Sequence, residues 1–532
     1  MPDARKRLTV SAQLGRWFLA RPFIFFALAA LAGMSAYLIY ASSAGVRAGF
    51  PLDDAWIHQT YARNLAQYGD FAYVPGVPSA GSTSPLWTLL LSAGYFAGLP
   101  YRVWTFTLGW LTLAGTGWGV WRLGRRLFPG QPSVALAAGA LCCVEWHLIW
   151  AALSGMETLL FCTLALPLMA RAIDHPDRPR RHLATGLLGG LLVLTRPEGA
   201  LLVGLVGLDP WIRMLQRRRQ VEDWPASLKG QFARSLALSA GFLLPVAPYI
   251  VFNMVVSGSP FPNTFYAKQA EYHALVEQLS LLARWGRVVG LTLVGSQLLL
   301  LPGFVAGLIA SLSAAIQRWR RAHAIDITPA SALPALYWLI FTLPYAASLP
   351  VTYQHGRYLM PAIPPLILLG AGGTAHLIGM MRNDARRRLV TVATLAAVTL
   401  LTLAFVGLGA SGYVDDVTII NGEMVEIAGW LNAETPVDAL IAAHDIGAIG
   451  YFARRPILDL AGLITPEVIP FIRDEAALLE FVIEEHADYL VTFPSWYPEM
   501  VASPALQMLY QTDCARTREL GQDNMAVYRA NR

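Results

Sequence analysis

Two adjacent aspartates, Asp53 and Asp54, stand near the start of a polar segment, Pro51 to Trp87, that lies between two strongly apolar runs. Two carboxylates at an apolar boundary can share a proton or hold a divalent cation such as Mg²⁺ or Mn²⁺, and one of them can take the proton from an incoming hydroxyl. One Asp can instead be the N-cap of the following helix. Capping explains only one of the two, so the pair indicates acid–base or metal chemistry.

A second set of residues places positive charge in otherwise apolar surroundings, where unpaired charge is costly. Arg196, Lys268 and Arg357 each follow or precede an apolar run, and His355 accompanies Arg357. Arginine forks match phosphate oxygens, which predicts an anion-binding role. An interfacial anchor is the alternative for a lone Arg beside Tyr. Because three cations occur in similar apolar surroundings, we favour the anion site.

The remaining candidates are two acids and a histidine. Glu157 and Glu198 are the matching acids, although Glu198 can simply pair with Arg196 across one proline. His58 lies one helical turn after Asp54 and can assist a metal or a substrate; a plain interfacial histidine is the alternative. We treat Glu157, Glu198 and His58 as candidate substrate-binding residues.

Two short helices must position the aspartates. Residues 55–68 carry Ile57, Tyr61 and Leu65 on one helical face and end at Gly69, a typical C-terminal stop. The apolar piece 86–99 is short for a membrane span, which favours an interfacial or re-entrant helix. Both belong to a large first external loop, residues 42–102.

Composition decides the class of protein. The chain has 532 residues, of which 55% are hydrophobic and only 14% charged, with a mean hydropathy of +0.46. Such a chain is a multi-span membrane protein. The pI of 9.0 reflects 40 Lys and Arg against 35 Asp and Glu. The basic residues gather in alternate loops, as the positive-inside rule predicts, so no nucleic acid is needed to explain them. We find no P-loop or dinucleotide fingerprint, and the four cysteines imply no disulfide framework.

The fold class we predict is mostly α, a polytopic membrane protein with about eleven transmembrane helices. A cleaved signal peptide is the alternative for the first apolar run, but that run is long and continues into the polar loop. We predict that the protein lies in the cytoplasmic membrane of the cell. Its N-terminus is then on the cytoplasmic side, and the polar motifs are on the external side. The predicted spans are 22–40, 103–121, 134–151, one from 157 to the basic loop 171–182, two on either side of 195–199, then 236–256, 288–312, one ending near 350, one returning to 382, and 389–408, with a surface helix before residue 284.

The tail is predicted to be a separate soluble domain outside the membrane. Residues 1–410 form the transmembrane domain and residues 411–532 a small α/β domain, with strand patterns at 437–444, 457–460 and 487–493 and a helix at 475–485. Its polar candidates are His444, Asp445, Asp459 and Glu467, and Asp445 is equally suited to a turn before a glycine.

Several motifs, taken in order, resemble a known family. They are LDDAWIHQTYARNLAQYG, GSTSPLW, SGMET, TRPEG, PFPNTFYAK, HGRYLMPAIPPL and HDIGAIGYFARRPILDLAGL. This series is similar to membrane glycosyltransferases of the GT-C superfamily, above all to bacterial arabinofuranosyltransferase-like proteins and more distantly to the protein mannosyltransferase type. The resemblance covers nearly the whole chain.

The resemblance implies transfer of a sugar from a polyprenyl-phosphate donor to a glycan, lipid or protein acceptor outside the membrane. An Asp of the first external loop would meet the acceptor hydroxyl, which maps onto Asp53 or Asp54, with Asp54 favoured as the base. Basic residues of later loops would hold the lipid phosphate, which maps best onto Arg357 and then onto Arg196 and Lys268. The His58-Gln59 pair departs from the family pattern, which leaves the sugar open.

Three other functions remain open at this point. A transporter or lipid flippase has many spans too, but we expect internal repeats and charges within its spans. A scaffold or sugar-binding protein would leave the aspartates and cations without a role. A ligase that moves a whole glycan from a diphosphate carrier is the nearest enzymatic alternative.

Overall fold

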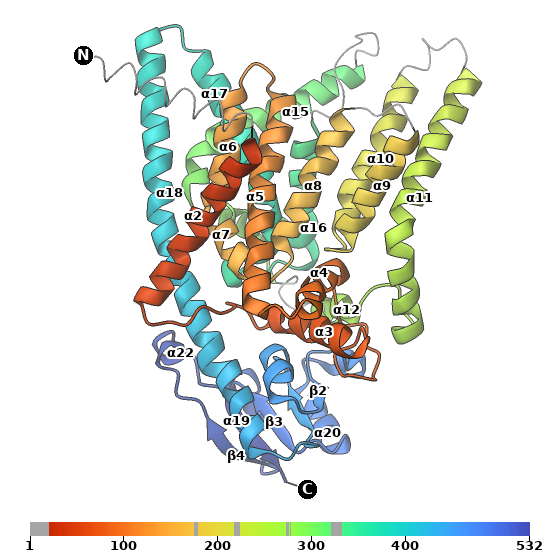
Figure 1. Cartoon of the computed structure of the whole chain (residues 1–532), viewed down its shortest axis with the longest axis vertical. Helices are drawn as coiled ribbons and strands as arrows, with labels where there is room; N and C mark the ends of the chain where they lie inside the picture. Colours follow the sequence, from red (N-terminus) through yellow and green to blue (C-terminus); the bar gives the residue numbers. More distant parts are fainter. Residues whose placement is uncertain are drawn as a thin grey trace.

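The computed structural model describes residues 21–531 except 175–178, 217–223, 273–275, 277 and 321–331. A bundle of long helices stands on a small domain that contains the only strands among these residues (Figure 1). The basic residues expected at the N-terminus (Arg5, Lys6, Arg7 and Arg16), at Arg217 to Arg219 and at Arg321 lie outside the described residues. The chain is a multi-pass membrane protein with mostly helical structure.

The bundle is built from apolar helices whose buried faces form one continuous core. The helices are α2 (Pro22–Ser43), α5 (Tyr101–Leu127), α6 (Pro132–Val144), α7 (Trp146–Leu153), α8 (Thr158–Ile173), α9 (Pro179–Val193), α10 (Gly199–Gln216), α11 (Trp224–Ser257), α15 (Leu301–Arg320), α16 (Leu333–Ser348), α17 (Ile363–Gly379) and α18 (Asp384–Ile420).

Not all of these helices are long and apolar enough to span a membrane unaided. Among the described residues five helices meet that test, or six if one bent pair forms a single span, and three more are apolar but shorter. Most of the expected spans correspond to a helix of the bundle, whereas the total of eleven membrane crossings stays a prediction.

One expected span is broken in the middle. The run 134–151 forms two helices, α6 and α7, which meet at a 51° bend. Glu145 stands at the break with an extended backbone, and its side chain accepts a hydrogen bond from the Leu148 amide at 3.0 Å. Its other oxygen contacts His147 at 2.7 Å and Gln297 at 3.1 Å. A buried acid that caps a new helix from inside the run explains the bend, because its hydrogen bonds replace those of a continuous helix.

The expected span 288–312 also divides. Helix α14 (Leu281–Leu291) is amphipathic, so the surface helix expected before residue 284 continues past it. A turn and the short helix η2 (Ser296–Leu300) follow before α15 begins at Leu301. The apolar residues at 288–291 therefore belong to a surface helix and not to a membrane span.

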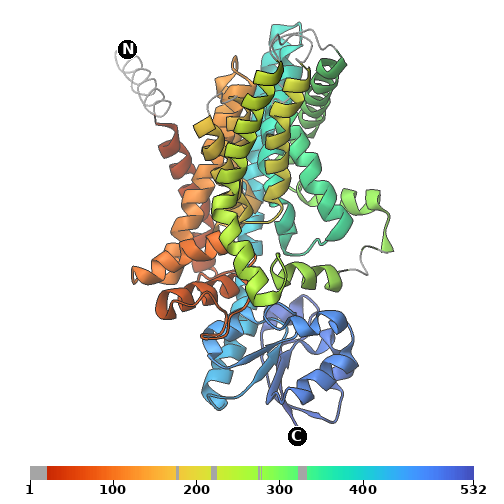
Figure 2. The same ribbon diagram turned by 90° about the vertical axis from the view of Figure 1, so that its right-hand side faces the viewer.

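Three short helices form a layer between the bundle and the C-terminal domain: α3 (Asp54–Tyr68), α4 (Pro85–Phe96) and α12 (Asn263–Glu271). Both views place α3 and α12 in this layer (Figure 1, Figure 2). Helix α3 ends as expected at Gly69, whose φ of 76° is the left-handed conformation that favours glycine. Trp56 and Tyr61 are buried against the C-terminal domain and the adjoining loop, so α3 is packed on both sides.

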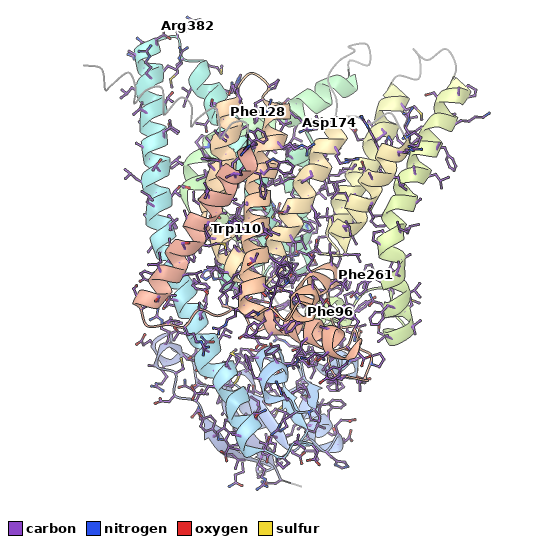
Figure 3. All side chains as sticks on the ribbon, in the orientation of Figure 1. Phe96, Trp110, Phe128, Asp174, Phe261 and Arg382 are labelled. Carbon is purple, nitrogen blue, oxygen red and sulfur yellow. The ribbon has the colours of Figure 1, made fainter. Side chains whose placement is uncertain are left out.

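The two ends of the bundle differ. Arg382 and Asp174 lie at the end far from the C-terminal domain, whereas Phe96 and Phe261 lie near the layer of short helices (Figure 3). Arg126 pairs with Asp174 at the far end, at 2.5 Å. Among the described residues, Arg126 and Arg382 thus lie at the end of the bundle opposite the layer of short helices, as the predicted topology requires.

The C-terminal domain carries one five-stranded sheet. Strands β1 (Ile441–Ala443), β2 (Ile457–Asp459) and β3 (Tyr489–Thr492) fall within the predicted strand patterns, and α20 (Glu475–Glu484) matches the predicted helix. Strands β4 (Leu506–Gln511) and β5 (Ala526–Ala530) were not predicted. The order is β2-β1-β3-β5-β4, with β1 parallel to β2 and β3 and the last two pairings antiparallel.

Helix α18 joins the two parts of the molecule without a break. It runs through residue 410, where we expected the domain boundary, and continues through the π-helical turn η5 (Asn421–Val425) into α19 (Glu426–Glu434). Within that turn the buried carboxylate of Glu423 accepts hydrogen bonds from Asn524 at 2.7 Å and from the Met525 amide at 2.9 Å. These hydrogen bonds attach the end of the helix to the residues that directly precede β5.

Candidate functional site

Asp54 lies at the centre of a compact group of charges, which we call the cation cluster: Asp54, Lys268, Arg357 and Tyr358. The Arg357 Nη2 donates to Asp54 Oδ2 and to the Tyr358 hydroxyl, the latter at 3.0 Å. The Lys268 Nζ donates to the same hydroxyl at 2.7 Å. Residues from α3, α12 and the helix η4 (Gln354–Ala362) therefore meet at one point beneath the bundle.

A tight reversal of the chain delivers Arg357 to this point. Gln354, His355 and Gly356 have φ angles of 52°, 57° and 67°, all in the left-handed region. Only glycine adopts this region freely, so the two preceding residues are strained and must be held by their surroundings. The reversal follows α16 and turns Arg357 inward, where it is only 5% exposed.

Arg357 has unused hydrogen-bonding capacity. Its Nε and Nη1 atoms are buried and have no hydrogen-bond partner, although Nη2 has two. A buried donor without a partner costs about 1–3 kcal/mol, and more on a charged group. Two unpartnered donors on one buried guanidinium beside a lysine therefore indicate a place for an anion with several oxygens.

The cluster controls the ionisation of Asp54. Burial alone would raise the pKa of this carboxyl, but the charges of Arg357 and Lys268 outweigh it and hold the pKa well below its usual range. With Arg357 on its carboxylate, Asp54 is ionised and weakly basic.

Beside the cation cluster lies a second group, which we call the acid–arginine group. Arg196 contacts Glu157 at 3.8 Å and Glu198 at 3.6 Å through Nε. Its Nη2 donates to the Tyr345 hydroxyl at 2.8 Å, and that hydroxyl in turn bonds Glu198. Arg196 thus faces two carboxylates, whereas, among the described residues, Arg357 and Lys268 have only the carboxylate of Asp54 between them.

His58 adjoins the acid–arginine group. Its Nε2 lies 3.7 Å from Glu157 Oε2 and its Nδ1 lies 3.4 Å from the Thr88 hydroxyl. Burial lowers the pKa of this imidazole, against the opposing charges of Glu157 and Asp54. The guanidinium of Arg196 also lies 5.5 Å from the Tyr358 ring, so the predicted residues of both groups form one continuous site.

Asp53 turns away from this site. It stands at the N-cap position of α3 but makes no capping bond there. Its two carboxylate oxygens accept hydrogen bonds from the amides of Gly447 at 2.7 Å and Ala448 at 2.8 Å. A Cβ on Gly447 would come within 2.0 Å of the Asp53 backbone oxygen, so glycine is required for this approach. Asp53 therefore joins the first external loop to the C-terminal domain.

The acidity of Asp53 differs accordingly from that of Asp54. Burial, followed by the neighbouring charge of Asp445, raises the pKa of Asp53 to about 8, although the two amide donors favour the carboxylate. Two adjacent residues thus have pKa values displaced in opposite directions by their surroundings.

The residues around the aspartates do not fit a divalent cation. Within the described part of the chain no three His, Cys, Asp or Glu side chains are arranged to hold a metal. Asp54 faces Arg357 and Lys268, which repel a cation, and both oxygens of Asp53 already accept amide hydrogens. Binding of Mg²⁺ or Mn²⁺ by Asp53 and Asp54 stays a prediction.

His355 is separated from its sequence neighbour Arg357 in the fold. Its Nε2 lies 2.8 Å from Asp416 Oδ2, and the Trp150 indole donates to the same oxygen at 2.8 Å. This places His355 against α18, where it helps to hold the strained reversal. The sequence resemblance alone did not reveal the partner, because Asp416 is 61 residues away.

The predicted motifs converge on this layer through main-chain contacts. The Trp87 indole donates to the Gly155 carbonyl at 2.8 Å, and the Ser84 hydroxyl donates to the Thr195 carbonyl at 2.7 Å. The Thr264 hydroxyl donates to the Gly81 carbonyl at 2.8 Å. The motifs that carry Glu157, Arg196 and Lys268 are therefore all fixed to the segment GSTSPLW, residues 81–87.

A further polar cluster occupies the C-terminal edge of β1, next to α12. His444 lies 3.4 Å from Asp445 and 3.9 Å from Glu271, which is one turn after Lys268 on α12. Burial alone would lower the pKa of His444, but the hydrogen bond to Asp445 and the charges of Asp445 and Glu271 raise it to about 9. The ring of Trp496 stands 5.2 Å away. Asp459 instead ties down its own loop, through the amides of Ala461 and Ile464.

Two tyrosines of the site were missed at the sequence level. Tyr358 receives hydrogen bonds from both cations of the cation cluster, and Tyr345 links Arg196 to Glu198. Tyr358 directly follows Arg357 in the sequence, and this adjacency could have identified it as a candidate. Tyr345 lies in a plainly apolar helix, and nothing in its neighbourhood distinguishes it from a core residue.

The fold is similar to that of several solved membrane proteins. The chain has the fold of the GT-C membrane glycosyltransferases, as the sequence resemblance predicted. ArnT from Cupriavidus metallidurans matches 96% of this chain and 98% of its own, with 13% identity and a TM-score of 0.56, and it has also been solved bound to undecaprenyl phosphate. Arabinofuranosyltransferase AftD from Mycobacteria matches 96% of this chain and 41% of its own, with 14% identity and a TM-score of 0.51.

Sequence comparison gives two partial matches. A terminal β-(1→2)-arabinofuranosyltransferase of Mycobacterium tuberculosis is 30% identical over 241 residues, which are 41% of this chain and 35% of that protein. The match thus covers about a third of that relative. A family model described as a domain of unknown function, DUF8728, matches residues 415–528, the C-terminal domain.

Proposed function

We propose that this protein transfers a sugar from a polyprenyl-phosphate carrier to an acceptor hydroxyl outside the cytoplasmic membrane. The observation that carries the proposal is the buried Arg357 guanidinium with two unpartnered donors, beside Lys268 and in contact with Asp54. The undecaprenyl phosphate bound to ArnT, a protein of the same fold, supports a lipid phosphate as the anion.

The carrier phosphate lies between Arg357 and Lys268 in this proposal. The free Nε and Nη1 of Arg357 form a fork that suits two phosphate oxygens, and Lys268 supplies a point charge. Arg196 stays with its two acids and helps to fix Tyr358 rather than binding the phosphate directly. Glu157, Glu198 and His58 then face the sugar.

The charge of the cation cluster favours a monophosphate carrier over a diphosphate. Lys268 and Arg357 are offset by Asp54 alone, so the cluster has one excess positive charge. A sugar joined to a lipid through one phosphate is a phosphodiester with one negative charge, whereas a diphosphate linkage has two. The glycan-ligase alternative would need a further cation, and Arg196 is already neutralised.

The reaction requires one proton acceptor and one leaving group. The acceptor oxygen forms a bond to the anomeric carbon while the bond from that carbon to the phosphate oxygen breaks, and the bonding electrons remain on the phosphate. Arg357 and Lys268 stabilise the charge that develops there. Asp54 takes the proton of the acceptor hydroxyl. Attack from the face opposite the phosphate inverts the sugar.

Donor binding also prepares the base. In the structure Arg357 holds Asp54 through Nη2, which keeps the pKa of Asp54 low. A phosphate on Arg357 competes with Asp54 for the same positive charge, so the carboxylate becomes more basic only when the donor is in place. The chain itself thus couples deprotonation of the acceptor to occupancy of the donor site.

The proposed topology follows from the two ends of the bundle. The N-terminus and the basic loops face the cytoplasm, and the C-terminal domain lies outside with the site, in keeping with the positive-inside rule. The sugar is a pentose or a hexose; the partial match to an arabinofuranosyltransferase favours a pentose. The acceptor is a glycan, a lipid or a protein of the cell envelope.

Transfer from a panel of radiolabelled polyprenyl-phosphate pentoses and hexoses tests the proposal. Membranes that contain the protein receive each donor with a cell-envelope extract as acceptor, and both transferred label and released polyprenyl phosphate are measured. Asp54→Asn should abolish both signals, whereas the matched control Asp438→Asn, at an exposed position of the C-terminal domain, should leave them unchanged.

The same assay separates the alternatives. Transfer from diphosphate carriers only would replace the proposal by the glycan-ligase function. Movement of labelled carrier across the membrane without any transfer would replace it by a flippase. Transfer that survives Asp54→Asn would exclude Asp54 as the base.

A further inference from the structure

A cavity of about 410 Å³ lies at the end of α3 that is remote from Asp54. Its walls come from the second half of α3, the loop around Tyr73 and residues 450–456 of the C-terminal domain. None of its lining residues belongs to the cation cluster or to the acid–arginine group. The volume is in the range of small-ligand sites.

The cavity is strongly basic. Arg63, Arg454 and Arg455 line it, and no Asp or Glu does. Arg63 donates to the Tyr451 carbonyl at 2.8 Å, and Arg455 donates to carbonyls of the same domain. Within the described part of the chain, neither arginine is paired with an acid. Arg454 is exposed and makes no hydrogen bond or ion pair with the described residues. Three uncompensated positive charges around one cavity favour an anionic ligand.

A buried amide adds a hydrogen-bonding group that a ligand could use. Asn64 is 1% exposed and lines the cavity. Its nitrogen donates to the carbonyls of Ala72 at 3.1 Å and Tyr73 at 2.7 Å, which fixes its orientation, while its oxygen has no partner. A buried acceptor without a donor needs an explanation, and a ligand hydroxyl supplies one. Gln67 and the exposed Tyr68 ring stand beside it, and amides and rings are suited to sugar hydroxyls and faces.

The distance from the reacting residues sets the role of this cavity. Arg63 follows Asp54 by nine residues on the same helix, which is about 13 Å along the helix axis. One sugar ring cannot span this separation, but a short oligosaccharide can. A ligand in the cavity is therefore not the sugar that reacts.

We propose that the cavity binds an anionic sugar unit of the acceptor, a ring bearing a carboxylate or a phosphate, several rings away from the reacting hydroxyl. This inference rests on the proposed function and identifies the acceptor as an acidic glycan. The arginines bind the anionic group, and the Asn64 oxygen accepts a hydrogen bond from a ring hydroxyl. The C-terminal domain thus takes part in acceptor selection through residues 450–456.

Equilibrium binding to the purified full chain tests this without any transfer reaction. The probes are trigalacturonate, mannose 6-phosphate and the neutral control maltotriose, measured by calorimetry in detergent. At least one anionic probe should bind, and maltotriose should bind at least about tenfold more weakly, since a charge-assisted hydrogen bond is roughly twice as strong as a neutral one. The probe that binds more tightly identifies the anionic group.

Arg454→Asn is the informative variant. Arg454 has a φ of 54°, and asparagine tolerates this left-handed conformation, so the change removes the charge without altering the backbone. Anion binding should weaken about tenfold, and maltotriose binding should not change. Arg473→Asn removes an exposed arginine from a turn in the same domain and should have no effect.

Two outcomes would overturn the proposal: equal binding of maltotriose and the anionic probes, or binding of none of the three. An unchanged affinity in Arg454→Asn would exclude the charge argument as well. Because the donor is absent from this experiment, a failure of sugar transfer would count against the proposed function and leave the binding result intact.

Discussion

Asp53 and Asp54 are adjacent in the chain but belong to two different regions of the molecule. Asp54 faces the bundle, where Arg357 and Lys268 lower its pKa. Asp53 faces the C-terminal domain, where two amides hold it and burial raises its pKa to about 8. The difference arises at the first turn of α3, because successive side chains there point about 100° apart. An acid pair in a sequence is therefore not evidence of a shared site.

The comparison predicts that substitutions of the two aspartates reduce the rate of sugar transfer by very different factors. Asp54→Asn should reduce sugar transfer about 10³-fold, within the range of general-base catalysis, while the protein still folds. Asp53→Asn keeps one acceptor for one of the two amides and should reduce transfer only a few-fold. Initial rates at saturating donor, normalised to folded protein, provide the measurement. Equal losses in the two variants would remove the distinction drawn here.

The bundle side of the comparison is sharpened by Arg357→Lys. Lysine keeps the charge but loses the fork that Nε and Nη1 present. We expect transfer to fall about a hundredfold, as for the loss of one donor to a developing anion, with KM for the lipid donor increased. The exposed Arg473→Lys is the matched control. A rate equal to that of the wild type would mean that charge alone holds the phosphate.

The C-terminal side is tested by stability rather than by rate. Asp53→Ala leaves the amides of Gly447 and Ala448 buried without partners, which should cost about 2–4 kcal/mol. Gly447→Ala places a Cβ against Asp53 and should cost a similar amount through the clash. Thermal melting in detergent measures both. If the double variant loses no more than either single one, the two changes act on the same contact.

The smallest effect concerns pH and His444. Its pKa is raised from about 6.5 to about 9, so its contribution to stability is fully present below pH 6.5 and is lost as the pH rises through 9. The loss is at most about 3 kcal/mol. Melting temperatures at pH 6 and pH 10 should therefore differ more for the wild type than for His444→Gln. An identical pH dependence in the two proteins would contradict the charge contact with Asp445 and Glu271.

Much of the architecture was predictable because local pattern and tertiary environment agree. The helical period of Ile57, Tyr61 and Leu65 with the stop at Gly69 gives α3 to within one residue of its start. The break at Glu145 was not predictable in the same way. Glu145 caps the new helix at the Leu148 amide and is held there by Gln297, 152 residues away, and an acid within an apolar run does not by itself say whether it caps a helix or lies in one.

The site was predictable as a set of residues but not as a geometry. Arg357, Lys268 and Asp54 were identified from their types and surroundings, and they meet. The role of Asp53 was hidden because its partners are main-chain amides almost 400 residues further along, and a backbone amide has no signature in a sequence. The contact of His355 was hidden by distance in the sequence, since Asp416 lies 61 residues further along, and a substrate-binding role for His355 stays a prediction.

The unbroken helix α18 has a mechanical consequence. Because a helix advances about 1.5 Å and turns about 100° with each residue, one residue inserted near position 410 would swing the whole C-terminal domain around the helix axis and carry Gly447 away from Asp53. Four inserted residues would nearly restore the orientation but push the domain outward by about one helical pitch. The number of residues in α18 therefore sets both the distance and the rotation of the C-terminal domain relative to the bundle. Exchange of C-terminal domains between relatives will succeed only when this number is kept.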